Sequence, residues 1–157
     1  MYRKLICLFA TLMFSTAVQA FGLLGNEVSI GMATPAPSGL SAKFWMSRDT
    51  AIDVFSEWDT TDKHFQMHAD YLLHDFEQFE FETEGTSMPL YFGLGLRLRT
   101  TESSATHIGI RIPIGVSYLW GVAPIDFFAE VGPRANIIPQ TSFAVDIMVG
   151  LRYRFIP

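Results

Sequence analysis

Apolar residues occupy every second position through most of the chain after residue 21, and this alternation constrains the fold more than any other feature. The stretch IGIRIPIGVSYLW, residues 108–120, shows the pattern without a break. Its four isoleucines, one valine, one tyrosine and one tryptophan share one face, while the other face mixes glycine with Arg111 and Pro113. Because successive side chains of a strand point to opposite sides, this period of two predicts β-strands that each have one apolar face.

Eight alternating runs are separated by residues that favour turns, so we predict eight strands. They are Glu27–Ala33, Leu40–Met46, Ala51–Trp58, Phe65–Leu73, Leu90–Arg99, Ile108–Tyr118, Ile125–Ile137 and Phe143–Phe155. All connections but one are short, which predicts an antiparallel up-and-down sheet, and an even number of strands closes into a barrel without an open edge. The long connection, residues 74–89, is acidic, and we expect it to extend a hairpin and to offer a docking surface to a periplasmic partner.

The first 20 residues have the composition of a cleaved secretory signal peptide. Arg3 and Lys4 precede an apolar run, and Val18–Ala20 fits a cleavage site of small residues. The alternative is an N-terminal membrane anchor, for which the apolar run is short. Cleavage leaves one domain, residues 21–157, and removes the only cysteine, Cys7, so the mature chain can form no disulfide.

The charge of the chain argues against binding to nucleic acid, which requires a basic surface. Removing Arg3 and Lys4 from the 11 basic residues leaves nine against 16 acidic ones, a net charge of about −7. No segment of the mature chain is apolar for long enough to form a transmembrane helix.

Two barrels of opposite polarity fit the alternation. In a periplasmic lipid carrier of the lipocalin type, the apolar face lines the interior. In an outer-membrane barrel, the apolar face contacts lipid and the polar face fills the lumen. The polar face favours the second barrel, because it carries many glycines and the aromatic residues Trp45, Phe55, Tyr91 and Phe128, which suit a narrow interior better than a wet surface.

The charges on the polar face nearly balance, as a closed lumen requires. Basic and acidic residues there include Asp53, Asp126, Glu27 and Arg154, and we predict a lumen network that consists of Lys43, Glu57, His68, Asp70, Arg97, Arg99, Arg111, Glu130, Arg134, Asp146 and Arg152. A narrow, gated ion pathway lined by the same charges is the alternative.

The apolar face ends in aromatic residues at several strand ends, as expected where strands meet the membrane interface. These residues are Trp58, Tyr71, Tyr118, Trp120, Tyr153 and Phe155.

In strand number, alternation and its last strand, VGLRYRF, the chain resembles the small eight-stranded outer-membrane β-barrels of Gram-negative bacteria, of the OmpA transmembrane-domain and OmpX type. The resemblance implies an outer-membrane location, contact with outer-membrane lipid, and recognition of the last strand by the barrel-assembly machinery. It also implies that both termini face the periplasm. The chain continues to Ile156 and Pro157, where this family commonly stops at the aromatic residue.

No spacing in the sequence identifies a catalytic, metal or cofactor site. His68 and Asp70 share a strand face, and His107 lies near Ser103 and Ser104, as a lipid-modifying enzyme would require, but no matching motif accompanies them. His64 and His68 are four residues apart on one strand, about 13 Å, which is too far for one metal ion. Pro113 lacks a donor within a predicted strand, and we expect a bulge there.

Overall fold

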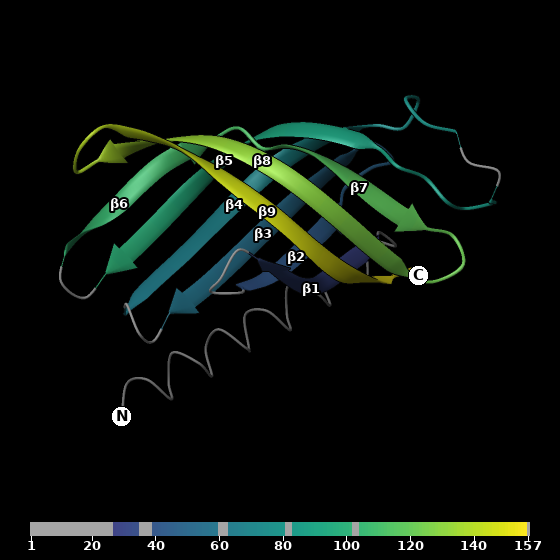
Figure 1. The fold of residues 1–157 in the computed structure, drawn as a ribbon, viewed down its shortest axis with the longest axis horizontal. Helices are drawn as coiled ribbons and strands as arrows, with labels where there is room; N and C mark the ends of the chain where they lie inside the picture. Colours follow the sequence, from purple (N-terminus) through teal and green to yellow (C-terminus); the bar gives the residue numbers. More distant parts are fainter. Residues whose placement is uncertain (1–26, 35–38, 60–62, 81–82, 102–103, 157) are drawn as a thin grey trace.

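The structure, a computed structural model, describes residues 27–34, 39–59, 63–80, 83–101 and 104–156. Within them the chain forms nine antiparallel strands that wrap around one interior (Figure 1). The strands are β1 (Val28–Thr34), β2 (Gly39–Trp45), β3 (Thr50–Asp59), β4 (His64–Asp75), β5 (Leu90–Thr101), β6 (Ser104–Arg111), β7 (Ile114–Trp120), β8 (Ile125–Ile138) and β9 (Ser142–Phe155). No helix in these ranges is long and apolar enough to cross a membrane.

The sheet closes on itself. Neighbours in the chain pair from β1 to β5 and again from β8 to β9, and β9 returns to pair with β1. β6 and β7 lie end to end between β5 and β8, so together they take the place of one strand. The predicted all-β barrel of eight antiparallel strands is therefore confirmed, and the sixth predicted strand corresponds to β6 plus β7. The predicted signal peptide lies outside the described residues.

The strands tilt strongly around the barrel. The paired positions run from Tyr153 through Ile30, Ala42, Val54, Ala69, Leu96, Ile110 and Ala135 and return to β9 at Phe143. One circuit of eight positions thus shifts the register by ten residues. At about 3.3 Å per residue and about 4.8 Å between strands, this shift corresponds to a tilt of roughly 40°.

The prediction of a bulge at Pro113 is wrong. The register between β5 and its neighbour is the same before Pro113, where Gly95 faces Arg111, as after it, where Phe92 faces Ile114. The carbonyl of Pro113 accepts from the Gly93 amide at 2.9 Å. Because proline has no amide hydrogen, the pair of Gly93 and Pro113 lacks only its second hydrogen bond. The register shifts lie elsewhere, between Arg99 and Thr101 and between Ile108 and Gly109.

The two faces of the barrel wall differ sharply in burial. The side chains of Leu94, Leu96 and Ile147 point outward and are 61%, 67% and 64% exposed, whereas those of Arg111 and Arg152 point inward and are fully buried. Inward residues that are buried alternate with more exposed outward residues along β4, along β5 as far as Arg97, and along β8 from Asp126 to Pro133. On β1 and β2 only part of the outward face is exposed: Met32 and Leu40 are 59% and 43% exposed, whereas Val28, Ala42 and Phe44 form a buried apolar cluster.

The long connection between β4 and β5 only partly extends the hairpin. Ser87 exchanges two backbone hydrogen bonds with Leu119, of 3.1 and 2.8 Å, and the Pro89 carbonyl accepts from Ser117 at 3.0 Å. The connection therefore continues the ladder between β5 and β7 beyond Leu90. Residues 76–80 form no strand, so the expected extension on the β4 side is absent in this described stretch.

Closure of the barrel between β1 and β9 can be tested by cross-linking. Ser29 and Arg154 face each other across this seam. The Arg154 amide donates to Pro124, on the β8 side, so the two residues form a non-hydrogen-bonded pair, in which the Cβ atoms lie close. In a Cys7→Ser background, we expect Ser29→Cys with Arg154→Cys to oxidise to a disulfide, seen as a mobility change on non-reducing gels. The matched pair Ser29→Cys with Arg99→Cys should stay reduced, and an open seam would leave both pairs reduced.

Candidate functional site

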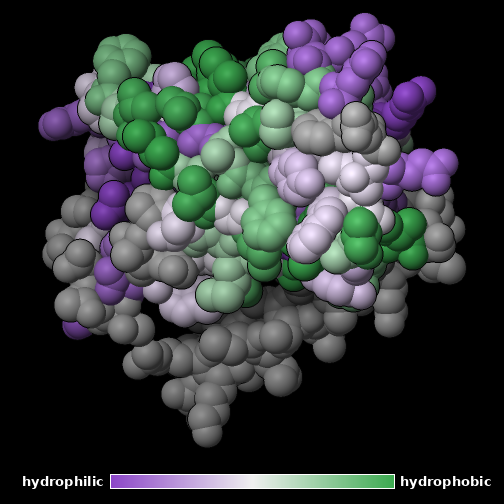
Figure 2. All heavy atoms as spheres, turned by 45° about the vertical axis from the view of Figure 1, so that its right-hand side comes forward, coloured by the Kyte–Doolittle hydropathy of each residue, from purple (hydrophilic) through white to green (hydrophobic). Residues whose placement is uncertain are grey.

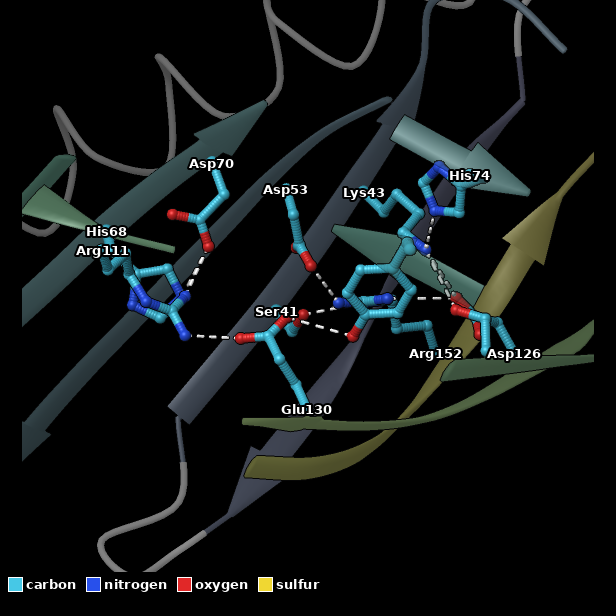
Figure 3. Close-up of polar contacts among 12 residues, drawn as sticks. Ser41, Lys43, Asp53, His68, Asp70, His74, Arg111, Asp126, Glu130 and Arg152 are labelled. Carbon is cyan, nitrogen blue, oxygen red and sulfur yellow. Dashed lines mark hydrogen bonds and ion pairs between the residues drawn. The ribbon is translucent and has the colours of Figure 1, made fainter. Parts of the chain in front are cut away.

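The barrel interior is filled by buried side chains that pair across the lumen. Near its centre, the guanidinium of Arg152 on β9 forms ion pairs with Asp53 on β3 and with Asp126 on β8, the latter at 3.1 Å (Figure 3). Its Nε donates to Ser41 Oγ on β2 at 2.8 Å, and its plane lies 3.7 Å from the centre of the Phe128 ring. One side chain therefore connects four strands.

Lys43 on β2 extends this central group towards the end of the barrel where β1 begins and β9 ends. Its Nζ lies 3.8 Å from Asp126 and donates to Ser117 Oγ and to His74 Nε2, each at 3.1 Å. It also lies 5.1 Å from the ring centres of Trp45 and Tyr91, within the range of cation–π attraction. An ammonium group that has lost its water thus keeps hydrogen-bond acceptors, a carboxylate and two aromatic rings around it.

Arg111 on β6 is the centre of a second group. It forms ion pairs with Asp70 on β4 and with Glu130 on β8, the latter at 2.5 Å. The Tyr91 hydroxyl donates to the other oxygen of Glu130 at 3.0 Å, so Tyr91 connects this group to Lys43. The planar guanidinium presents its donors to the two carboxylates in fixed directions, which the ammonium group of a lysine does not.

A third group lies at the other end of the lumen, which we call the outer mouth. There Arg134 pairs with Asp146 at 2.8 Å, and Glu57 lies 3.0 Å from His64. Arg97 is bound differently from the other buried cations, because its partners are amide oxygens. It donates to Gln66 and, at 3.3 Å, to Asn136.

Among the described residues, the buried lysine and arginine side chains balance the buried aspartates and glutamates. Four cations, Lys43, Arg97, Arg111 and Arg152, accompany four carboxylates, Asp53, Asp70, Asp126 and Glu130. Breaking one buried ion pair leaves the other charge without a partner, at a cost of about 3–5 kcal/mol. The arrangement therefore favours a filled and rigid interior.

Glycines on the inward face give the large side chains their space. A Cβ at Gly132 would meet the guanidinium of Arg111, and a Cβ at Gly150 would meet the ring of Phe128. Both glycines lie in strands, where glycine is otherwise unfavourable. Their positions are thus explained by the close approach of a neighbouring side chain.

Apolar residues close the lumen at the end where β1 begins and β9 ends. Trp45, Ala51 and Leu119 form a buried cluster against which Phe76 packs. Outside it, Arg154 pairs with Glu27 through two contacts of 2.6 and 2.8 Å. Phe76, the first residue after β4, therefore helps to cover this end of the interior.

The structure brings most of the predicted lumen residues into contact with one another. Asp53 and Asp126, which belong to the polar face but not to the predicted network, are central to it. His68 lies 3.6 Å from Asp70 and stacks on Phe55 with 5.1 Å between ring centres. Arg99 is half-buried at the outer mouth and forms no ion pair with another described residue.

Sequence reasoning missed several uncharged partners. Ser41, Ser117, His74, Gln66 and Asn136 all contact buried cations. Their inward position follows from the alternation, and that signal was available in the sequence. Which cation each one contacts depends on the register across the lumen.

The predicted interface aromatics lie on the outward face near the strand ends. Trp58 is close to the outer end of β3, and the others lie towards the opposite end. Five of them are exposed: Trp58, Tyr71, Trp120, Tyr153 and Phe155; Tyr118 is half-buried.

No group of three or more histidine, cysteine, aspartate or glutamate residues within the described ranges has a geometry suited to a metal ion. His68 is 3% exposed and enclosed by the network, so it offers no access to a substrate. Ser103 lies outside the described residues.

Comparisons with known proteins gave three structural neighbours. No family model matches the chain, and no curated protein matches it. The N-terminal β-barrel domain of Pseudomonas aeruginosa OprF is 16% identical, covers 83% of this chain and 96% of its own, and has a TM-score of 0.47. Neisserial surface protein A is 18% identical over 83% of this chain and 94% of its own, with a TM-score of 0.44. Ail, the attachment invasion locus protein of Yersinia pestis, is 11% identical over 83% of this chain and 99% of its own, with a TM-score of 0.35. All three are small eight-stranded outer-membrane barrels.

Replacing Arg111 tests the energetic role of the interior. We expect Arg111→Ala to lower the free energy of unfolding by about 3–5 kcal/mol, because Asp70 and Glu130 lose their cation. Urea titration of the barrel in detergent, followed on unheated gels, measures this loss. Arg99→Ala, at a half-buried position without an ion pair to another described residue, should cost far less. A large gain in bilayer conductance without loss of stability would contradict the structural role.

Proposed function

We propose that the chain is an integral outer-membrane β-barrel whose lumen is closed by paired charges, and that it acts through its lipid-facing and exposed surfaces. One observation carries the proposal: apolar residues point outward along the wall, and the buried charges point inward. A protein in water would reverse this arrangement, since exposed apolar area is unfavourable there and buried charge is expensive.

The outer wall has the properties of a lipid-facing surface. Figure 2 shows hydrophobic residues gathered in a broad area on one face of the barrel, with hydrophilic residues above and to its right. An apolar groove of about 610 Å³ crosses β1, β9, β8 and β7, with Met32, Val116, Phe127 and Val149 in its lining. Large exposed apolar surfaces mark contact with a membrane or a partner.

The burial pattern opposes the alternative of a periplasmic lipid carrier. Such a carrier needs an apolar interior, yet Lys43, Arg111 and Arg152 occupy this one. The same filled interior is unsuited to a general pore, and His68, the histidine that a lipid-modifying enzyme would use, is buried within it. We therefore favour a non-enzymatic role in membrane integrity, lipid contact or partner binding.

The proposal includes export through the predicted signal peptide, and folding of the last strand by the barrel-assembly machinery. The connection between β4 and β5 would then lie in the periplasm. It exposes Glu77, Glu80, Glu84 and Phe79, which suits a periplasmic partner that carries basic and apolar groups.

Membrane fractionation tests the proposed location. The protein should stay with the outer-membrane fraction after washing with alkaline carbonate, and it should migrate faster on gels before heating than after. Recovery in the soluble periplasm, with no heat-dependent shift, would contradict the proposal.

A single charge on the outer wall gives a quantitative test. Leu94 lies near the middle of β5 and is 61% exposed. In a bilayer, Leu94→Arg should lower the free energy of unfolding by about 2–4 kcal/mol, because arginine near the midplane must reach water or deform the bilayer. The control Gln140→Arg lies in a turn beyond the strands and should change it by less than about 0.5 kcal/mol. Equal effects at the two positions would indicate that Leu94 faces water.

A further inference from the structure

The apolar groove on the outer wall follows two neighbouring rows of paired residues across β7, β8, β9 and β1 (Figure 1). Small residues form its floor, because Ala129 carries one methyl group and Gly150 carries no side chain. The groove therefore reaches the backbone of the wall between larger side chains. The row nearer the end where β9 finishes consists of Tyr118, Phe127, Leu151 and Met32, and the other row consists of Val116, Ala129, Val149 and Thr34.

The groove rises obliquely from that end of the barrel towards the middle of the wall. Paired rows climb as they pass from β9 to β1 and onward, because one circuit shifts the register by ten residues. At a tilt of roughly 40°, the three steps from β7 to β1, of about 4.8 Å each, raise the row by roughly 9 Å. The low end of the groove therefore lies on β7, and its high end lies on β1 at Met32 and Thr34.

The connection between β4 and β5 completes the low end of the groove. Ser87 and Leu119 exchange two backbone hydrogen bonds, and this register places Met88 beside Tyr118 on the outward face. The side chain of Met88 lines the groove. A segment outside the nine strands thus forms one border of this hollow.

The exposed charge next to the low end is acidic. The Gly121 amide donates to Thr86 Oγ1 at 3.0 Å, and a Cβ at Gly121 would meet the carbonyl oxygen of Glu84. The turn that carries Glu84 is therefore held against the end of β7, and the Glu84 side chain is exposed there. Neither of the described segments 83–89 and 114–124 contains a lysine or an arginine.

We propose that the groove holds one acyl chain of a periplasmic-leaflet phospholipid whose headgroup carries an ammonium group, as in phosphatidylethanolamine. This inference rests on the proposed membrane location and names the lipid class that one part of the wall selects. The chain enters beside Met88 and Tyr118 and passes over Ala129. The ammonium group lies at the level of Glu84, where it donates to the carboxylate, whereas an anionic headgroup would meet a like charge.

The size of the groove suits a single chain. At about 30 Å³ for a group as large as a water molecule or a methylene, a volume of 610 Å³ holds roughly 20 such groups. The hydrophobic effect does not favour this contact inside a bilayer, because the surrounding chains are equally apolar. An unfilled hollow would instead lose dispersion contacts along its lining. Packing therefore places a chain in the groove, and the contact with Glu84 selects the headgroup.

The test uses Trp120 as a local probe in the folded barrel, because it lies two residues beyond Tyr118 and is 38% exposed. Trp58→Phe removes the exposed tryptophan of the opposite end, and Trp45 is buried. In phosphatidylcholine nanodiscs, chain-brominated phosphatidylethanolamine should quench Trp120 half-maximally at a mole fraction about threefold lower than chain-brominated phosphatidylglycerol, as one exposed charge contact allows. The reciprocal barrel, Trp120→Phe with Trp58 retained, should show no such preference.

Two substitutions in the Trp58→Phe barrel separate the headgroup from the chain. Glu84→Gln removes the charge and Ala129→Phe fills the groove, so each should abolish the preference. The matched controls are Glu77→Gln, an exposed position on the β4 side of the same connection, and Ala69→Phe, an exposed outward position on β4. Both controls should keep the preference, and the heat-dependent gel shift shows that each variant is folded.

The possible failures are distinguishable. Equal quenching by the two lipids, a preference that survives Glu84→Gln or Ala129→Phe, or an equal preference at Trp58 would overturn the inference. Loss of quenching by both lipids together with a cross-linked dimer would assign the groove to a second copy of the chain and would overturn the lipid assignment. Absence of the protein from the membrane fraction would overturn the proposed function itself, whereas a folded membrane barrel without lipid preference would overturn only this inference.

Discussion

Two buried guanidinium groups, those of Arg111 and Arg152, determine how the interior of this barrel is built. Each contacts two carboxylates from other strands, so each ties together parts of the chain that are far apart in sequence. Burial of an arginine without partners would cost more than most single interactions stabilise. The position of Asp53, Asp70, Asp126 and Glu130 therefore follows from the need to match charge within a closed sheet.

The rest of the interior adapts to these groups. Gly132 leaves room for Arg111, Gly150 leaves room for Phe128, and Phe128 in turn supports Arg152. A barrel of eight strands has an interior just wide enough for its side chains, so large residues must alternate with small ones. This packing explains why the inward face is rich in both glycine and arginine.

The positions of the strands, and which of their side chains point inward or outward, could be predicted because both depend on a local alternation of period two. Partners could not be predicted, since the contact between Arg152 and Asp53 depends on a register shift of ten residues accumulated around the whole sheet. The bulge predicted at Pro113 is absent for a different reason, because the ladder tolerates a single missing donor without a shift in register.

The central claim is that one face of the wall contacts lipid and the other is sealed from it. Nuclear Overhauser effects between lipid acyl protons and leucine methyl groups, measured by NMR in lipid nanodiscs, test it most directly. The account predicts cross-peaks to the outward-facing Leu94 and Leu96, and none to Leu72 and Leu119, which are buried inside. Cross-peaks from acyl chains to Leu72 with none to Leu96 would contradict it.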